Sequence, residues 1–119
     1  MYQKLKSPNI NGWLVVDKPS GLGSTDIVNL VKKRIGIKKL GHGGTLDPDA
    51  TGLLPIAIGE ATKTIRFTEN LLKTYEFRVT LGVSTDTDDA SGNIIRRSEK
   101  RPNTNDIRKA LKNFKGEVQ

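Results

Sequence analysis

A stretch rich in glycine and proline interrupts the chain between Gly41 and Pro55. It reads GHGGTLDPDATGLLP and holds four glycines, two prolines, two aspartates and the single histidine of the protein. Glycine and proline both disfavour the interiors of helices and strands. We therefore expect a loop here, too irregular for a helix and too broken for a strand, with the regular elements of the fold on either side of it.

The segments around this loop carry helix and strand patterns in alternation. Apolar runs and period-two alternation predict strands, whereas apolar residues three and four apart predict helices. Ser24 or Thr25 suits the N-cap of the first helix, and Gly36 suits its end. The acidic run from Ser84 to Asn93 is expected to form a hairpin turn rather than a calcium loop, because Ser91 stands where such a loop needs glycine. The expected strands cover residues 12–18, 53–59, 74–83 and 94–97, and the expected helices cover residues 24–36, 60–72 and 104–116.

The order of these elements, βαβαββα, predicts an α+β fold. We expect a mixed, mainly antiparallel sheet with flanking helices. A length of 119 residues fits one domain or part of one, and the absence of cysteine excludes a disulfide framework and indicates a reducing compartment. The N-terminus contains no apolar run of the length that a signal peptide or membrane span requires. The expected location is therefore the cytoplasm, without membrane association.

The net charge of the chain is +7, which favours a polyanionic partner or simply aids solubility. Five basic residues lie between Lys32 and Lys39, next to the glycine-rich loop. Within the loop, Asp47 precedes Pro48, which suits an N-cap followed by the first residue of a helical turn. The alternative is a nucleophilic carboxylate. A protein that only binds RNA gains nothing from presenting a carboxylate to it, whereas a protein that attacks RNA through a carboxylate requires this arrangement.

Three segments together resemble the TruB family of tRNA pseudouridine synthases. GHGGTLDPDATGLLPIAIGEATK is similar to the catalytic motif of that family, and INGWLVVDKPSGLGSTDIV is similar to its N-terminal motif. TYEFRVTLGVSTDTDDASG resembles its tyrosine-bearing strand and the acidic turn that follows. Two positions depart from the pattern: Gly43 stands where many relatives carry threonine, alanine or serine, and Asp49 where they often carry an apolar residue. The resemblance implies that residues 1–119 are the N-terminal part of a catalytic domain that continues in relatives, followed there by a small RNA-binding domain.

The resemblance also implies a reaction and a set of site residues. The reaction is conversion of uridine to pseudouridine at position 55 in the T-arm of tRNA, with Asp47 as nucleophile and no metal or other cofactor. Tyr75 would stack on the target uracil, and His42 would fill the space that the flipped nucleotide leaves. The catalytic loop would be supported by Lys18, Pro19, Gly44 and Thr45, and the RNA backbone would be contacted by Lys32, Lys33, Lys38 and Lys39. The implied enzyme is a monomer that needs no protein partner, and an isolated N-terminal part is expected to have little activity.

Two other functions use the same residues. A non-catalytic chaperone that binds and folds tRNA would employ the basic cluster and His42, and Asp47 would then serve only as a cap. A pseudouridine synthase directed by a guide RNA would share the catalytic motif but would need that RNA. The Asp47→Asn variant separates the first alternative from an enzyme, and activity on bare tRNA separates the second.

Overall fold

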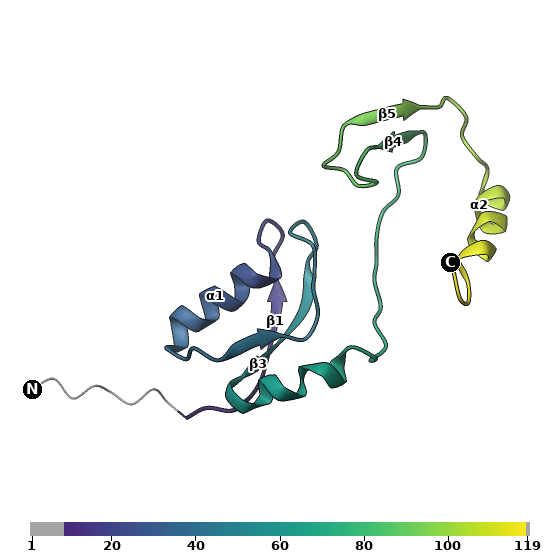
Figure 1. Cartoon of the computed structure of the whole chain (residues 1–119). Coiled ribbons are helices and arrows are strands. Elements are labelled where there is room, and N and C mark those ends of the chain that lie inside the picture. The colour runs from purple at the N-terminus through teal and green to yellow at the C-terminus, as the bar shows by residue number, and fades with distance from the viewer. Residues whose placement is uncertain (1–8, 119) are drawn as a thin grey trace, which may run out of the picture. The chain divides into compact units, whose positions relative to one another are not determined.

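A computed structural model of the protein describes residues 9–118 (Figure 1). The chain divides into two compact units, Met1–Lys73 and Thr74–Gln119, which are taken one at a time below. The single part-domain expected for residues 1–119 includes residues 1–8 and 119, which lie outside the described range. Within the described range, no helix has the length and apolar character needed to cross a membrane.

The first unit is built on a three-stranded sheet. Its strands are β1 (Gly12–Lys18), β2 (Leu40–His42) and β3 (Gly52–Ile58), in the order β1-β3-β2. Both pairs are antiparallel, and β3 pairs with β1 along its whole length, from Gly12 opposite Ile58 to Lys18 opposite Gly52. The strand predicted from residue 53 is confirmed as β3, whereas the strand at residues 40–42 was not predicted, and residues 43–51 form the irregular loop between them.

Pro55 determines where β2 ends. The register that puts His42 opposite Ile56 would put Gly43 opposite Pro55 next. Gly43 N donates to Pro55 O at 2.8 Å, but proline has no N–H to return to the Gly43 carbonyl. Thr68 Oγ1 lies 3.1 Å from that carbonyl and 2.7 Å from Ile65 O, so its single proton is shared between these two acceptors. Loss of one ladder hydrogen bond thus releases the loop from the sheet without leaving a buried carbonyl unpaired.

Helix α1 (Ser24–Ile35) is capped by a glycine at each end. Gly36 adopts the left-handed conformation at φ 69°, and its N–H donates to Lys32 O, as expected for a C-cap glycine. The predicted N-cap at Ser24 or Thr25 is wrong, because Gly23 occupies that position. The Gly23 N–H is bonded by the Asp26 carboxylate at 2.9 Å, and the Ser24 hydroxyl is engaged elsewhere.

The core of the first unit lies between α1 and one face of the sheet. Ile27 and Val28 of α1 pack against Leu54 and Ile56 of β3, and the two β3 side chains are fully buried. Burial of each such side chain contributes about 1.5–3 kcal/mol to stability. Partly buried side chains complete this cluster: Val16, Leu22, Val31, Leu40 and Leu46. Leu46 belongs to the loop, so the loop is attached to the core by an apolar anchor.

The 3₁₀ helix η1 (Gly59–Thr68) follows β3 directly and occupies most of the segment predicted as a helix. It begins at Gly59, whose φ of 62° favours glycine, and Asn11 Oδ1 accepts from the Glu60 N–H at 2.8 Å. The helix lies against the sheet, since a Cβ added at Gly41 would approach Ile65 Cδ1 to 2.8 Å. The glycine at position 41 allows this close approach.

The second unit contains a short hairpin of β4 (Val83–Thr85) and β5 (Ile94–Arg97). The acidic turn between them is held by its own side chains, as the sequence predicted for a hairpin. Asp86 accepts from the Asn93 N–H at 2.8 Å, and Asp89 accepts from the Ser91 N–H at 2.8 Å and from Thr87 Oγ1 at 2.7 Å. Hydrogen bonds from Ser91, and then from Thr87, lower the pKa of Asp89 to about 2.

The strand predicted over residues 74–83 is largely wrong. Only Val83 to Thr85 are strand, and residues 72–80 have no regular structure. The alternation of apolar side chains marks one face of an extended chain, but a strand also needs a hydrogen-bonded neighbour. Here β5 supplies that neighbour only as far as Gly82, whose carbonyl accepts from the Ser98 N–H at 2.9 Å.

The predicted C-terminal helix is present as α2 (Thr104–Leu111), extended by the 3₁₀ turn η2 (Lys112–Phe114). Asn103 is its N-cap, and the Asn103 side chain accepts from the Asp106 N–H at 3.0 Å. Helices beside antiparallel strand pairs confirm the predicted α+β class. All strand pairs among the described residues are antiparallel.

Candidate active site

Asp47 lies at the start of a tight turn in the loop between β2 and β3. The Ala50 N–H donates to the Asp47 carbonyl at 3.0 Å, which closes a four-residue turn with Pro48 and Asp49 at its centre. No helical turn follows, so the predicted helix-capping arrangement is not formed. The Asp47 side chain is exposed, and its carboxylate accepts no hydrogen bond from any residue in the described range. The carboxylate is therefore free for an external partner.

Lys18, at the end of β1, is fully buried beside this turn. Its Nζ donates to three carbonyl oxygens, at 2.9 Å to Pro19, 2.6 Å to Leu22 and 3.1 Å to Pro48. An ammonium has three donors, so every one of them is used on backbone acceptors. The Pro48 carbonyl also accepts from the Gly21 N–H at 2.8 Å. The residue directly after Asp47 is thus bonded to the end of β1 and to the segment that leads into α1.

Ser24, at the start of α1, binds the residue directly before Asp47. Its Oγ accepts from the Leu46 N–H at 2.9 Å and donates to the Leu46 carbonyl at 3.1 Å. No local pattern in the sequence predicts this contact, because the two residues lie 22 positions apart. The backbone on both sides of Asp47 is therefore anchored, whereas the Asp47 carboxylate is not.

His42 is the last residue of β2 and lies opposite Ile56. Opposed residues of an antiparallel pair share a face of the sheet, so the ring lies on the same face as the buried Ile56. The side chain is half-buried, and its Nδ1 is inaccessible and has no hydrogen-bond partner among the described residues. An unpaired buried nitrogen is uncommon in folded proteins.

The glycines and threonine between His42 and Asp47 differ in their surroundings. Gly43 is buried, and a Cβ there would lie 2.9 Å from Thr68 Oγ1 and 3.2 Å from Trp13 Cζ3. A Cβ at Gly44 would meet nothing within 4 Å, and the Thr45 side chain is exposed. Of these two glycines, Gly43 is therefore the one that packing restricts more. Support of the loop by Gly44 or Thr45 stays a prediction.

The basic residues in the last turn of α1 and just after it fall into two groups. Lys33 and Lys38 are exposed and Lys32 is half-buried, and these three side chains form no ion pair within residues 9–118. Lys39 instead contacts Glu60 at 2.7 Å, and Lys63 contacts the other oxygen of the same carboxylate. The hydrogen bond from Lys39, and then that from Lys63, lowers the pKa of Glu60 to about 2. Of the four lysines predicted to contact RNA, Lys39 is thus the one already paired.

Tyr75 belongs to the second unit. It lies in the segment without regular structure before β4, and 64% of its side chain is exposed. The other apolar residues that alternate with it, Phe77 and Val79, are exposed as well. Packing within its unit therefore does not account for the tyrosine.

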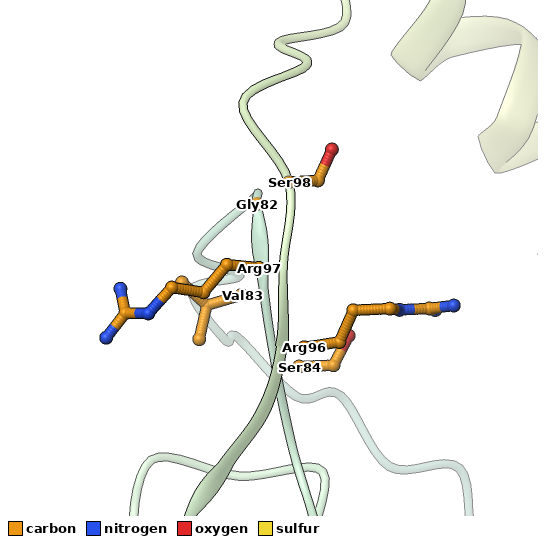
Figure 2. A pocket seen from close by; sticks show the side chains of 6 residues that line it. All are labelled: Gly82, Val83, Ser84, Arg96, Arg97 and Ser98. Atoms are coloured by element: carbon orange, nitrogen blue, oxygen red, sulfur yellow. The ribbon is translucent and has the colours of Figure 1, made fainter.

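A shallow recess on the hairpin was not anticipated from the sequence. It is lined by Gly82, Val83, Ser84, Arg96, Arg97 and Ser98. Figure 2 shows that Arg97 and Val83 point to one side of the two strands, whereas Arg96 and Ser84 point to the other. Because these side chains diverge, the recess does not gather polar groups around one ligand, unlike a built small-molecule site. We therefore place the candidate site at the Asp47 turn.

Comparison with known proteins identifies the class to which this fold and site belong. The family model for the N-terminal domain of TruB family pseudouridylate synthases matches residues 32–119. The match spans most of the chain and includes the Asp47 turn. The chain is therefore a member of the TruB family of pseudouridylate synthases.

The relatives carry a more particular name. Proteins named tRNA pseudouridine synthase B are 55% identical to this chain over 119 residues in Ruegeria sp. strain TM1040 and 56% identical over 113 residues in Cereibacter sphaeroides. These alignments cover 100% and 95% of this chain. They cover 39% and 38% of the relatives, so the chain spans well under half the length of these proteins.

Solved structures with local similarity come from two complexes. One chain, from an H/ACA RNP bound to a substrate RNA containing 2′-deoxyuridine, is 43% identical over 47% of this chain and 18% of its own, with a TM-score of 0.46. Another, from a Cbf5-Nop10-Gar1 complex, is 44% identical over 46% of this chain and 17% of its own, with a TM-score of 0.45.

Proposed function

We propose that this chain takes part in the isomerisation of uridine to pseudouridine at position 55 in the T-arm of tRNA, with Asp47 as the nucleophile. Membership of the pseudouridylate synthase family supports the reaction type, and the names of the relatives support tRNA as the substrate. The observation that carries the role of Asp47 is local. Its carboxylate is exposed and accepts no hydrogen bond from the described residues, while the backbone on both sides is anchored.

The chemistry needs a nucleophile and proton transfer, but no redox equivalent. The bond from N1 of uracil to C1′ of the ribose breaks, and a bond from C5 to C1′ forms. C5 loses one proton and N1 gains one, so the product has the same atoms as the substrate. A carboxylate without hydrogen-bond donors around it keeps its electron pairs available for attack. This requirement fits the environment of Asp47 better than it fits a helix cap.

The other predicted site residues have roles on the RNA in this proposal. His42 occupies the gap left in the stack when the target nucleotide flips out, and Tyr75 stacks on the flipped uracil. Because His42 is only half-buried, the face of its imidazole ring can stack on a neighbouring base. Lys32, Lys33 and Lys38 contact phosphates.

Tritium release tests the proposal. The substrate is tRNA labelled at C5 of uridine, and the proteins are the parent chain, Asp47→Asn and Asp49→Asn. Asp49 is the matched control, because it is an exposed aspartate in the same turn. The parent and Asp49→Asn should release tritium at rates within about threefold of each other, whereas Asp47→Asn should release none and still bind tRNA. Replacing uridine 55 of the tRNA should abolish the release.

The same variants are also tested in a longer protein, because this chain spans well under half the length of its relatives. This chain can replace the 119 aligned residues of the Ruegeria relative, and the same variants can be made in that chimera. A chimera in which Asp47→Asn retains activity would refute the nucleophile assignment. An inactive parent in both contexts that still binds the T-arm selectively would favour the chaperone function. Activity that appears only after a guide RNA is added would indicate the guided type of synthase.

A further inference from the structure

Ser24 is a buried hydroxyl that helix capping does not explain. Only 4% of the residue is exposed, although serine at the start of a helix normally faces the first turn. Gly23 is the N-cap of α1, and Asp26 already satisfies the Gly23 N–H. Helix formation therefore makes no demand on the Ser24 hydroxyl, and its hydrogen bonds must serve another purpose.

Those hydrogen bonds are both directed at one residue of the loop. The Leu46 N–H donates to Ser24 Oγ at 2.9 Å, and Ser24 Oγ donates to the Leu46 carbonyl at 3.1 Å. The Leu46 N–H belongs to the peptide plane before that residue, and the carbonyl belongs to the plane shared with Asp47. One hydroxyl therefore fixes two successive peptide planes, and the second of these includes the Asp47 nitrogen.

The clamp from Lys18 acts on the opposite side of Asp47. It holds the Pro48 carbonyl, together with the Gly21 N–H. If hydrogen bonds held the backbone on only one side of Asp47, the backbone on the other side could still move and the dihedral angles of Asp47 could change. Two clamps, one from each side, restrict the direction of the Asp47 Cα–Cβ bond. No other side chain among the described residues hydrogen-bonds the backbone of Leu46.

We propose that Ser24 is a positioning residue that sets the direction of the Asp47 carboxylate by holding both peptide groups of Leu46. This inference rests on the proposed function, in which that carboxylate attacks a ribose. Attack requires the reacting atoms to be placed within a fraction of an ångström, and a misplacement of about 1 Å lowers a rate by about 100-fold. Binding of tRNA does not depend on this placement, because it draws on phosphate contacts elsewhere.

The test separates turnover from binding. Ser24→Ala is compared with Thr25→Ala, an exposed neighbour in the same helical turn, in the full chain and in the chimera with the Ruegeria relative. We expect Ser24→Ala to lower kcat at least tenfold, with KM for tRNA within about twofold, and Thr25→Ala to change neither. Amide hydrogen exchange at Leu46 should become faster in Ser24→Ala only, because that N–H loses its acceptor. If Ser24→Ala does not fold, Ser24→Cys, of similar size but with a weak S–H donor, provides the same comparison.

The measured kcat, KM and exchange rate each test a different part of the proposal. An unchanged kcat in Ser24→Ala, or a loss confined to KM, would overturn the positioning role while leaving the proposed function intact. Unchanged exchange at Leu46 would overturn the anchor itself. A parent that forms no pseudouridine in either context would overturn the proposed function and, with it, the catalytic role of Ser24.

Discussion

Lys18 Nζ lies 3.1 Å from the carbonyl oxygen of Pro48, 30 positions further along the chain. This contact joins the end of β1 to the residue that follows Asp47, across the loop that the sequence showed to be irregular. The same ammonium satisfies two more carbonyls, of Pro19 and Leu22. A fully buried lysine is rare unless its charge is compensated. Here three backbone dipoles provide the compensation.

Replacement of this lysine should destabilise the first unit. Lys18→Met keeps much of the volume but removes one donor from each of three carbonyl oxygens, of which the Pro48 carbonyl still accepts from the Gly21 N–H. We expect the free energy of unfolding to fall by about 3 kcal/mol or more. Urea titration followed by the fluorescence of Trp13, the single tryptophan of the chain, measures it. Lys33→Met, at an exposed site on α1, is the control and should change stability by less than about 0.5 kcal/mol. Equal midpoints for the two variants would contradict the clamp.

Thr68 should stabilise the protein through the carbonyl that Pro55 leaves unpaired. Thr68→Val preserves the shape of the side chain but removes the donor to Gly43 O, and Gly43 is buried. We expect a loss of about 1–3 kcal/mol, the usual effect of stranding one buried acceptor. Thr64→Val is matched, since the exposed Thr64 hydroxyl donates only to Ala61 O in the same helix. Thermal unfolding of the two variants gives the comparison, and a larger loss for Thr64→Val would exclude this account.

Glu60 should make stability depend on pH in the acid range. Its pKa is about 2 in the folded protein, below the ordinary value of 4.5, because Lys39 and Lys63 bond its charged form. A lowered pKa adds stability above pH 4.5, and that stability is lost as the pH falls towards 2. We expect the Tm difference between the parent and Glu60→Gln to shrink over that window. The effect should be small and weakened by salt, since the carboxylate is exposed. Glu69→Gln, at an exposed glutamate without an ion pair in the described range, should show no such window.

The basic residues in the last turn of α1 and just after it should differ in their contribution to RNA binding. Neutralising a lysine that contacts a phosphate lowers the slope of log K against log salt by about one. We expect this change for Lys33→Gln and Lys38→Gln. The change should be smaller for Lys39→Gln, because the Lys39 ammonium already forms an ion pair with Glu60. Filter binding of tRNA at several salt concentrations measures the slopes. Lys100→Gln, in the second unit, serves as the reference, and an equal slope change for all four variants would indicate non-specific attraction.

The features predicted correctly from the sequence are those in which the interacting residues lie close together along the chain. The glycine at the end of α1, Gly36, was predicted as a C-cap and adopts the required left-handed conformation. The turn after β4 was also predicted, because Asp86 and Asp89 bond residues at most seven positions away. In both cases the residue type and its neighbours determine the geometry.

The errors come from partners that are distant in sequence. Ser24 was expected to cap α1, but its hydroxyl is used by Leu46, 22 positions away. The strand expected from residue 74 lacks a neighbouring strand over most of its length, so alternation alone could not define its extent. The hydrogen bonds from Lys18 and Ser24 to the residues beside Asp47 could not be predicted from the apolar pattern either, because they join distant positions. Only the family resemblance indicated that Lys18 matters for the loop.

The two clamps on the Asp47 turn also impose an order of assembly. Both originate in segments that precede the loop along the chain, at the end of β1 and the start of α1. Ordering the turn before those segments have formed would cost loop-closure entropy with no hydrogen bond to offset it. The turn should therefore become ordered only after β1 and α1 have formed. A newly synthesised chain in which these two elements have not formed then carries Asp47 on a disordered segment, and only their formation gives the Asp47 side chain a fixed direction.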